Sequence, residues 1–185
     1  MIRILVLAIS LACVALPARA TEAGWALLRE GGHVVLLRHA MASGTADQQN
    51  VDPEDCRTQR NLTERGKLQA RKMGALFAAR AAPVEEVLTS RYCRARDTAK
   101  LAFRDSPIED AAFLDPMPAD EEAAQAARQA ILDVVSSYRG SDNKVLVTHL
   151  ENIQAMTGGT AREGEALIVT VDGDRLHVLA RIIFN

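Results

Sequence analysis

Three short apolar runs constrain the fold of this chain more than any other feature of the sequence. They are Val34–Leu37, Val87-Leu88 in the segment EEVLTS at 85–90, and Val145–Val147, and each run gives way to polar or charged residues. Runs of this length without polar interruption are typical of strands that are buried on both faces. The sequence therefore favours a sheet that is covered by helices on both sides.

Helical patterns separate these predicted strands. Thr63 is a plausible N-cap for a helix that runs to about residue 82, and helices are also predicted over 91–103 and 121–138. Small residues dominate one face of the first of these helices, so we expect it to lie close against the sheet. Residues 166–184 read as two strands joined by a hairpin turn at Asp172-Gly173. The alternation predicts one three-layer α/β/α domain with a mainly parallel sheet.

The first twenty residues have the composition of a secretory signal peptide. Arg3 precedes an apolar stretch over 4–16, and Ala18-Arg19-Ala20 has the small-residue spacing of a cleavage site. We therefore expect residues 1–20 to be removed, residues 21–185 to form the domain, and the protein to be periplasmic, with no stable membrane anchor. A retained anchor is the alternative. A lipoprotein site at Cys13 is disfavoured because Ser10 stands where such a site has leucine.

The charge of the chain argues against polyanionic partners. The formal net charge is −2, and without Arg3 and Arg19 the mature chain has 20 basic against 24 acidic residues, a net charge of −4. The sequence contains no basic stripe or polybasic tail of the kind that binds nucleic acid or anionic lipid. An anionic ligand would therefore need a locally positive pocket.

Two cysteines, Cys56 and Cys93, remain after the predicted cleavage. In an oxidising compartment such a pair is a disulfide candidate, and two free thiols are the alternative. Neither cysteine fits the C-x5-R loop of cysteine phosphatases, because Leu62 and Ala99 occupy the sixth position after them. We therefore predict a structural role for both.

The strand ends bring a concentrated positive charge to one edge of the predicted sheet. Arg38 and His39 follow the first strand, Arg94 follows the second, and His149 follows the third. The carboxyl ends of parallel strands lie along one edge, where open α/β sheets bind their ligands. Burying two guanidiniums and two imidazoles together is costly without a counter-ion, and guanidiniums match phosphate oxygens well. The sequence therefore predicts a site for a dianionic phosphoryl group.

The segments LLRHA, TSRYCRARDTA and VLVTHLEN resemble, in order, the three signature segments of the histidine phosphatase superfamily, and NLTERGKLQA resembles the helix start after the first. The resemblance implies the phosphoglycerate-mutase-like fold, here with little or no cap. It also implies that His39 is the nucleophile that carries a phosphohistidine intermediate. Arg38, Arg94 and His149 would bind the phosphoryl oxygens, and no metal or cofactor is expected.

The general acid is where the sequence departs from the best-known members of that family. Many of those members carry a glutamate in a Glu-Gly segment, or a His-Asp pair after the second histidine. Here Leu150-Glu151 follows His149, so there is no His-Asp pair. The loop over 113–122 resembles the corresponding segment of small phosphohistidine phosphatases. From that loop we favour Asp120, with Glu121 as second choice. Other acids that remain open are Asp115, Glu122 and Glu151.

The alternative for these acids is that they cap the N-terminus of the next helix. Arg91 lines the mouth of the site or is a solvated residue at a helix start. His33 and His177 are expected at surface or packing positions, because one begins a strand and the other lies within the terminal hairpin.

These features predict an exported, metal-independent phosphatase that hydrolyses phosphomonoesters. The expected substrates are phosphorylated small molecules or envelope components, such as the sugar phosphates of the lipopolysaccharide core. A phosphohistidine protein phosphatase is the alternative enzyme. A phosphate-binding protein without turnover is the alternative of another class.

Overall fold

The computed structural model of the protein describes residues 16–47 and 50–184. Residues 1–15, which hold most of the predicted signal peptide, lie outside the described residues. The helices and strands follow the order α1 (Leu16–Glu30), β1 (Val34–Arg38), α2 (Glu64–Ala79), β2 (Val84–Thr89), α3 (Cys93–Ala102), β3 (Ile108–Asp110), α4 (Glu121–Ser137), β4 (Asn143–Thr148), α5 (Leu150–Thr157), β5 (Glu165–Asp172) and β6 (Arg175–Ile183). Two 3-10 turns, η1 (Cys56–Thr58) and η2 (Ala112–Leu114), complete the list.

The described strands form a six-stranded sheet in the order β3-β2-β4-β1-β5-β6. β3, β2, β4 and β1 are parallel, which confirms the mainly parallel sheet. β5 runs antiparallel to β1 and forms the predicted hairpin with β6. Gly173 has a positive φ of 63° in the hairpin turn, a conformation that glycine adopts without steric cost.

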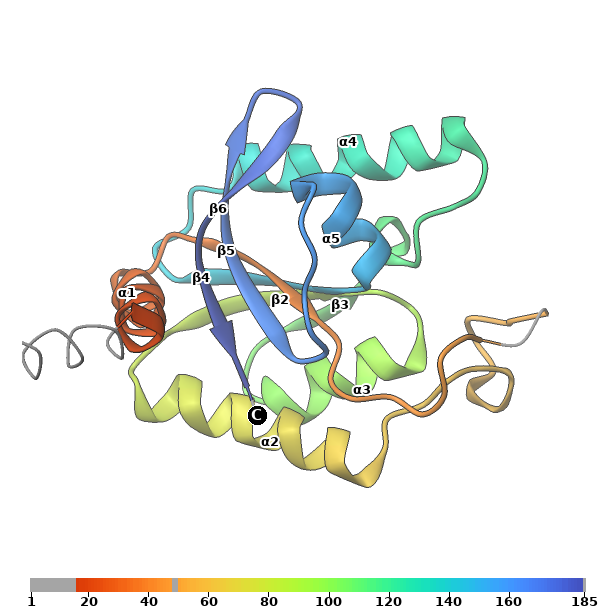
Figure 1. The fold of residues 1–185 in the computed structure, drawn as a ribbon, viewed down its shortest axis with the longest axis horizontal. Helices are drawn as coiled ribbons and strands as arrows, with labels where there is room; N and C mark the ends of the chain where they lie inside the picture. The colour runs from red at the N-terminus through yellow and green to blue at the C-terminus, as the bar shows by residue number, and fades with distance from the viewer. Residues whose placement is uncertain (1–15, 48–49, 185) are drawn as a thin grey trace, which may run out of the picture.

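Both faces of the sheet are covered by helices, as predicted for a three-layer α/β/α domain. Val35 and Leu37 of β1 pack in one core cluster with residues of α1, α2 and α3. Val34 and Leu36 pack in a second cluster with residues of α4 and α5. Figure 1 shows these two groups of helices on opposite sides of the sheet. The alternation explains why the run is continuously apolar: both faces of the strand are buried.

The helix starts follow the capping residues. The side-chain oxygen of Thr63 accepts a hydrogen bond from the backbone N–H of Gly66, and Asp120 does the same for Ala123 at the start of α4. α2 packs mainly against α3, and not as closely against the sheet as the sequence analysis expects. A side chain at Gly74 would collide with the carbonyl oxygen of Ala102, so this glycine allows the two helices to approach.

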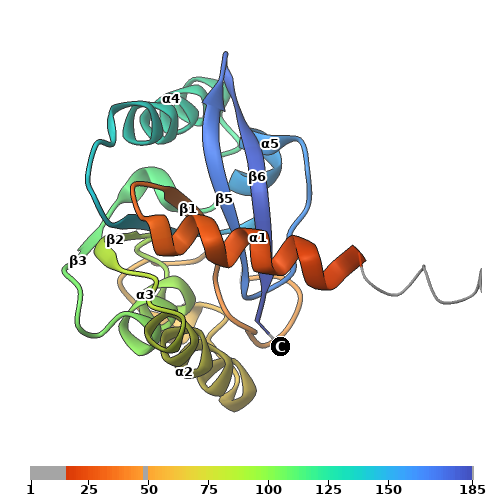
Figure 2. The ribbon, with the colours of Figure 1, turned by 90° about the vertical axis from the view of Figure 1, so that its left-hand side faces the viewer.

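The structure contains two elements that the sequence analysis did not predict, β3 and α5. β3 is only three residues long, and α5 starts directly after the residue that ends the β4 signature, His149. α1 begins at Leu16, so it includes the backbone of the expected cleavage site. Figure 2 shows α1 crossing beside β6.

No helix among residues 16–47 and 50–184 is long and apolar enough to cross a membrane.

Candidate active site

The carboxyl ends of β1, β2 and β4 lie side by side. Arg38 is paired with Thr148, and Thr89 with Val147. The hydrogen bonds continue one residue beyond the strands: the N–H of His39 donates to the carbonyl of Thr148 over 3.1 Å. The sheet thus delivers the residues that follow these strands to a common edge, as the sequence predicts.

His39 is 2% exposed and its ring is held in one orientation. Nδ1 lies 2.8 Å from the carbonyl oxygen of Ala40, which can only accept, so Nδ1 carries the proton. Nε2 receives a hydrogen bond of 3.3 Å from Nε of Arg94. Nε2 is therefore the nitrogen with a free electron pair, and it stands beside a guanidinium.

Burial lowers the pKa of His39 from 6.5 to about 3. The hydrogen bond to Ala40 acts in the opposite direction, while the positive charges of Arg94, Arg38 and Arg60 lower the pKa further. His39 is therefore neutral at neutral and mildly acidic pH. A neutral imidazole with an unprotonated Nε2 has the form that a nucleophile needs.

His149 lies next to His39, with 5.3 Å between the ring centroids, and it is 1% exposed. Its Nε2 is 2.8 Å from the hydroxyl of Ser90. Its Nδ1 is buried and has no hydrogen-bond partner in the part of the chain that the structure describes. Burial, followed by the proximity of His39 and the charge of Arg94, holds the pKa of His149 well below its ordinary value.

Arg94 is the second residue of α3 and is 3% exposed. Its Nη1 and Nη2 atoms each lie 3.0 Å from an oxygen of Asp47, and its guanidinium lies over the ring of Tyr92 at 5.0 Å. Burial lowers its pKa, and the charge of Asp47 opposes that change. The sequence analysis did not predict Asp47 in the site.

Arg38 ends β1 and is half-buried. Nη1 donates to the carbonyl of Ala161 over 2.7 Å, and Nη2 lies 3.9 Å from a carboxylate oxygen of Glu163. Its Nε is buried without a partner among the described residues. Arg38 and His149 each therefore have one buried nitrogen that no described protein group satisfies, and both nitrogens suit a phosphoryl oxygen.

Arg60 also belongs to this region, although the sequence analysis did not identify it. Its positive charge lowers the pKa of His39, His149, Arg38 and Arg94. Its side chain donates to the carbonyl of Ser43 and to Glu163. In the sequence, only its position just before the NLTERG segment could have indicated a role for Arg60, because it lies in a polar loop that has no periodic pattern.

The two preferred acids of the sequence analysis lie at the start of α4. Asp120 is exposed and accepts from the N–H of Ala123, as a helix cap does. Glu121 is exposed and pairs with Arg128 at 2.6 Å. No hydrogen bond or ion pair joins either acid to Arg38, His39, Arg94 or His149 within the described residues. Capping explains their positions, and a role as general acid is not supported by these contacts.

Asp115, in the same loop, does reach the site through other residues. It accepts a hydrogen bond of 2.9 Å from Ser90, which in turn contacts His149, and it also pairs with Arg91. Glu151 lies in the first turn of α5 and is exposed. Its charge acts on both Arg38 and Arg94, opposing the effect of burial on the pKa of each guanidinium.

Cys56 and Cys93 form a disulfide, with their Cα atoms 5.7 Å apart. Beside it, the N–H of Cys93 donates to the side chain of Gln59 over 2.9 Å. The disulfide joins η1, in the long loop after β1, to the first residue of α3. It therefore connects the loop that carries Asp47 and Arg60 to the helix that carries Arg94.

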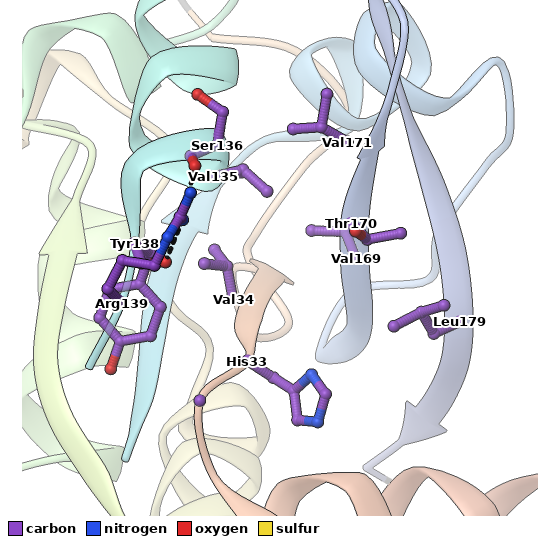
Figure 3. A pocket seen from close by; sticks show the side chains of 11 residues that line it. His33, Val34, Val135, Ser136, Tyr138, Arg139, Val169, Thr170, Val171 and Leu179 are labelled. Carbon is purple, nitrogen blue, oxygen red and sulfur yellow. Dashed lines mark hydrogen bonds between the residues drawn. The ribbon is translucent and has the colours of Figure 1, made fainter. Parts of the chain in front are cut away.

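A cavity of about 430 Å³ lies at the other end of the strands, near the start of β1, and none of the active-site residues described above lines it. Figure 3 shows it between the end of α4 and the β5–β6 hairpin, with His33 at the start of β1. His33 therefore lies at the wrong end of the strand for the site, as expected. His177 is exposed on β6, also as expected.

Solved structures with the same fold are phosphatases by their descriptions. The chain is similar to the protein histidine phosphatase SixA complexed with tungstate, with 20% identity, a TM-score of 0.57, and coverage of 82% of this chain and 96% of that one. It is also similar to a putative phosphohistidine phosphatase SixA from Agrobacterium tumefaciens, with 19% identity, a TM-score of 0.55, and coverage of 81% of this chain and 97% of that one. A third similar structure is a putative alpha-ribazole-5'-P phosphatase from Escherichia coli, with 15% identity, a TM-score of 0.61, and coverage of 83% of this chain and 98% of that one. No curated protein matches the chain at a significant level.

The model of one sequence family matches residues 34–117, a range that contains β1, the loop after it, α2, β2 and α3. This range carries Arg38, His39 and Arg94. The similar structures share the fold over 81–83% of this chain. Residues 34–117 of the chain thus match the histidine phosphatase superfamily (branch 1), and the domain has the histidine phosphatase fold.

Proposed function

We propose that this phosphatase hydrolyses phosphomonoesters by transferring the phosphoryl group first to Nε2 of His39 and then to water. One observation carries the proposal: Nε2 of His39 is unprotonated, buried and 3.3 Å from Nε of Arg94. A nucleophile and a cation that can bind the group under attack thus stand together.

In the first step Nε2 of His39 forms a bond to phosphorus while the bond between phosphorus and the ester oxygen breaks. The phosphoryl oxygens carry the developing charge, which Arg38, Arg94 and His149 stabilise. The buried Nε of Arg38 and Nδ1 of His149, which have no partner among the described residues, are the groups that a phosphoryl group would satisfy.

The ester oxygen that leaves needs a proton, and we assign this role to Glu151. Asp47 already accepts hydrogen bonds from Arg94 and from the backbone N–H of Arg60. Glu151 accepts no hydrogen bond and forms no ion pair within the described residues, and its charge acts on Arg38 and Arg94. After giving up its proton, Glu151 takes one from the water that attacks phosphorus, the bond to His39 breaks, and inorganic phosphate is released.

The leaving group tests this assignment. With p-nitrophenyl phosphate, whose product is a good leaving group, Glu151→Gln is expected to keep most of the phosphorylation rate. With an alkyl phosphate, whose oxygen must be protonated, it is expected to lose about a hundredfold or more. Equal losses with both substrates would contradict the role, and Glu122→Gln on the exposed start of α4 is the matched control.

We propose further that the protein acts in the periplasm on envelope sugar phosphates, including those of the lipopolysaccharide core. The signal-like residues 1–20 and the disulfide between Cys56 and Cys93 support an oxidising compartment. N-terminal sequencing of protein from a periplasmic fraction tests the location. A chain that starts at Thr21 supports it, whereas a chain in the cytoplasm with residues 1–20 retained contradicts it.

Hydrolysis of p-nitrophenyl phosphate in the presence of excess chelator tests the reaction itself. Turnover by the wild type is expected to fall by about a thousandfold or more in His39→Ala, and to remain unchanged in His33→Ala at the opposite edge of the sheet. Turnover that survives His39→Ala would contradict the proposal. Phosphate binding without turnover of any ester would favour a phosphate-binding protein, and turnover confined to a phosphohistidine peptide would favour a phosphohistidine phosphatase.

A further inference from the structure

A chain of three side chains connects Asp115 to the active-site histidine of β4. The hydroxyl of Ser90 lies 2.9 Å from Oδ1 of Asp115 and 2.8 Å from Nε2 of His149. The backbone N–H of Tyr92 also donates to that hydroxyl, over 3.2 Å. Ser90 and His149 are both buried, at 0% and 1% exposure. None of the sequence signatures assigns a role to Ser90 or Asp115.

The donors and acceptors of this chain determine where the protons are. A carboxylate only accepts, so the single proton of the Ser90 hydroxyl points to Asp115. The oxygen of Ser90 then accepts from Tyr92 and from Nε2 of His149. Nε2 of His149 must therefore carry a proton, which leaves Nδ1 as the bare nitrogen of the neutral ring.

We propose that Ser90 and Asp115 are positioning residues that hold His149 in its Nε2–H form and allow Nδ1 to take up a proton and donate it in a hydrogen bond to a bound phosphoryl group. This inference rests on the proposed function, because the phosphoryl group is the partner of Nδ1. Asp115 supplies a negative charge at one end of the chain, and the charged form of His149 is stabilised at the other end.

Asp115 is itself held firmly, which suits a positioning role. It follows η2, and its carbonyl accepts from the side chain of Asn152 over 2.9 Å. Its carboxylate also accepts from the backbone N–H and Nε of Arg91, both over 2.8 Å. The carboxylate is thus placed by α5 and by the segment after β2, and its side chain is 13% exposed.

Other charges around His149 oppose the protonated form. Arg38 faces it from the end of β1, beside the neutral ring of His39, while Arg94 faces it from α3 and Arg60 from the loop before α2. The ring of Tyr92 contacts His149 edge-on at 5.3 Å between centroids. In this cationic surrounding, a dianionic phosphoryl group together with the Asp115 charge is what makes protonation of His149 favourable.

Nitrogen NMR of protein labelled with 15N in histidine tests the tautomer without using activity. In the wild type, His149 is expected to show a protonated Nε2 and a bare Nδ1, whereas His39 shows the reverse. Ser90→Ala is expected to move the His149 signals toward a mixture of both tautomers while the His39 signals stay unchanged, which also reports that the site is folded. Ser106→Ala, whose hydroxyl contacts the carbonyl of Val84, is the control.

A His149 ring with its proton on Nδ1 in the wild type, or His149 signals that do not change in Ser90→Ala, would overturn the proposal. Failure of the proposed phosphatase reaction would leave these signals as expected. The two failures are therefore distinguishable.

The dependence of kcat/KM on pH tests the contribution of Asp115. In Asp115→Asn the alkaline limb of the pH profile of kcat/KM is expected to move by about one pH unit toward acid, because protonated His149 loses a stabilising charge. At neutral pH kcat/KM is expected to fall about tenfold, as is typical when an outer hydrogen-bond partner of a histidine is removed. Asp110→Asn, which alters the exposed pair with Arg96, is expected to leave the profile unchanged. Ser90→Thr, which keeps the hydroxyl, is expected to retain the wild-type limb. A uniform loss at all pH values in both Asp115→Asn and Ser90→Ala would indicate a structural role only and overturn the proposal.

Discussion

His39 and His149 occupy equivalent places at the ends of two adjacent parallel strands, yet the protein fixes them in opposite ways. A backbone carbonyl holds the proton of His39 on Nδ1, while a side-chain relay from Asp115 through Ser90 holds the proton of His149 on Nε2. The difference shows how two buried histidines at the same end of the sheet can have different roles. His39 is held as a neutral nucleophile, whereas His149, with 5.3 Å between the ring centroids, is a hydrogen-bonding group whose protonation depends on its partners.

Substituting each histidine in turn is expected to give the largest effect and to separate the two roles. His39→Gln is expected to abolish phosphoenzyme formation, with a loss in kcat of about a thousandfold or more. His149→Gln is expected to lower kcat by about a hundredfold, because one hydrogen bond to the transition state is lost while the nucleophile remains. Single-turnover kinetics measure both, and equal losses with no phosphoenzyme in either variant would break the comparison.

Removing the disulfide is expected to disturb the His39 side of the site more than the His149 side. The double substitution Cys56→Ser and Cys93→Ser releases a loop closure of 37 residues, for which chain entropy suggests a loss of about 4 kcal/mol in unfolding free energy. Urea denaturation measures the loss. Since Arg60 lies in the released loop, phosphate affinity is expected to fall in the folded variant, while the 15N signals of His149 stay the same.

The stability of the protein is expected to fall as the pH is lowered below about 6.5. The folded state holds the pKa of His39 at about 3, below the unfolded value of 6.5, so between these values the unfolded chain binds a proton that the folded protein does not. For His39 alone this amounts to about 2 kcal/mol between pH 7 and pH 5. Urea denaturation of His39→Gln should show a correspondingly shallower pH dependence than the wild type.

His149→Gln should also reduce this pH dependence, because burial lowers the pKa of His149 in the same direction. The two variants therefore compare how much each histidine contributes to the pH dependence of the unfolding free energy. A pH dependence identical to that of the wild type in both would mean that the histidines are protonated in the folded state.

The smallest expected effect concerns Asp47, the anion that pairs with Arg94 at 3.0 Å. Its carboxylate competes with a phosphoryl group for the same guanidinium, so Asp47→Asn is expected to tighten the binding of inorganic phosphate by about fivefold, near the upper end of the effects measured for single ion pairs at protein surfaces. Isothermal titration calorimetry measures the affinity, with Asp55→Asn, on an exposed pair with Arg57, as control. Weaker phosphate binding would show instead that Asp47 orients Arg94.

Much of the frame was predictable because it depends on local patterns. The apolar runs that end in Arg38-His39 and in His149 predicted both the sheet and the convergence of these residues. Thr63 predicted the start of α2, and the pair Cys56 and Cys93 is joined as expected.

The rest depends on contacts between distant segments. Asp47 and Arg60 lie in a polar loop whose path is set by the disulfide and by η1, so no periodicity marks them. Asp115 and Asp120 look alike in sequence, and only the fold shows that one reaches Ser90 while the other caps α4. α5 escaped prediction because His149 is both the end of a strand signature and the cap of the helix.

Trapping the covalent intermediate tests the central claim most directly. Wild-type protein mixed with a phosphomonoester and quenched rapidly in alkali, where phosphohistidine survives, is digested and analysed by mass spectrometry, and 31P NMR identifies the nitrogen. We predict a phosphoryl group on His39, attached to Nε2, and none on His149. Phosphorylation of His149, attachment at Nδ1 of His39, or turnover without any phosphohistidine would contradict the account.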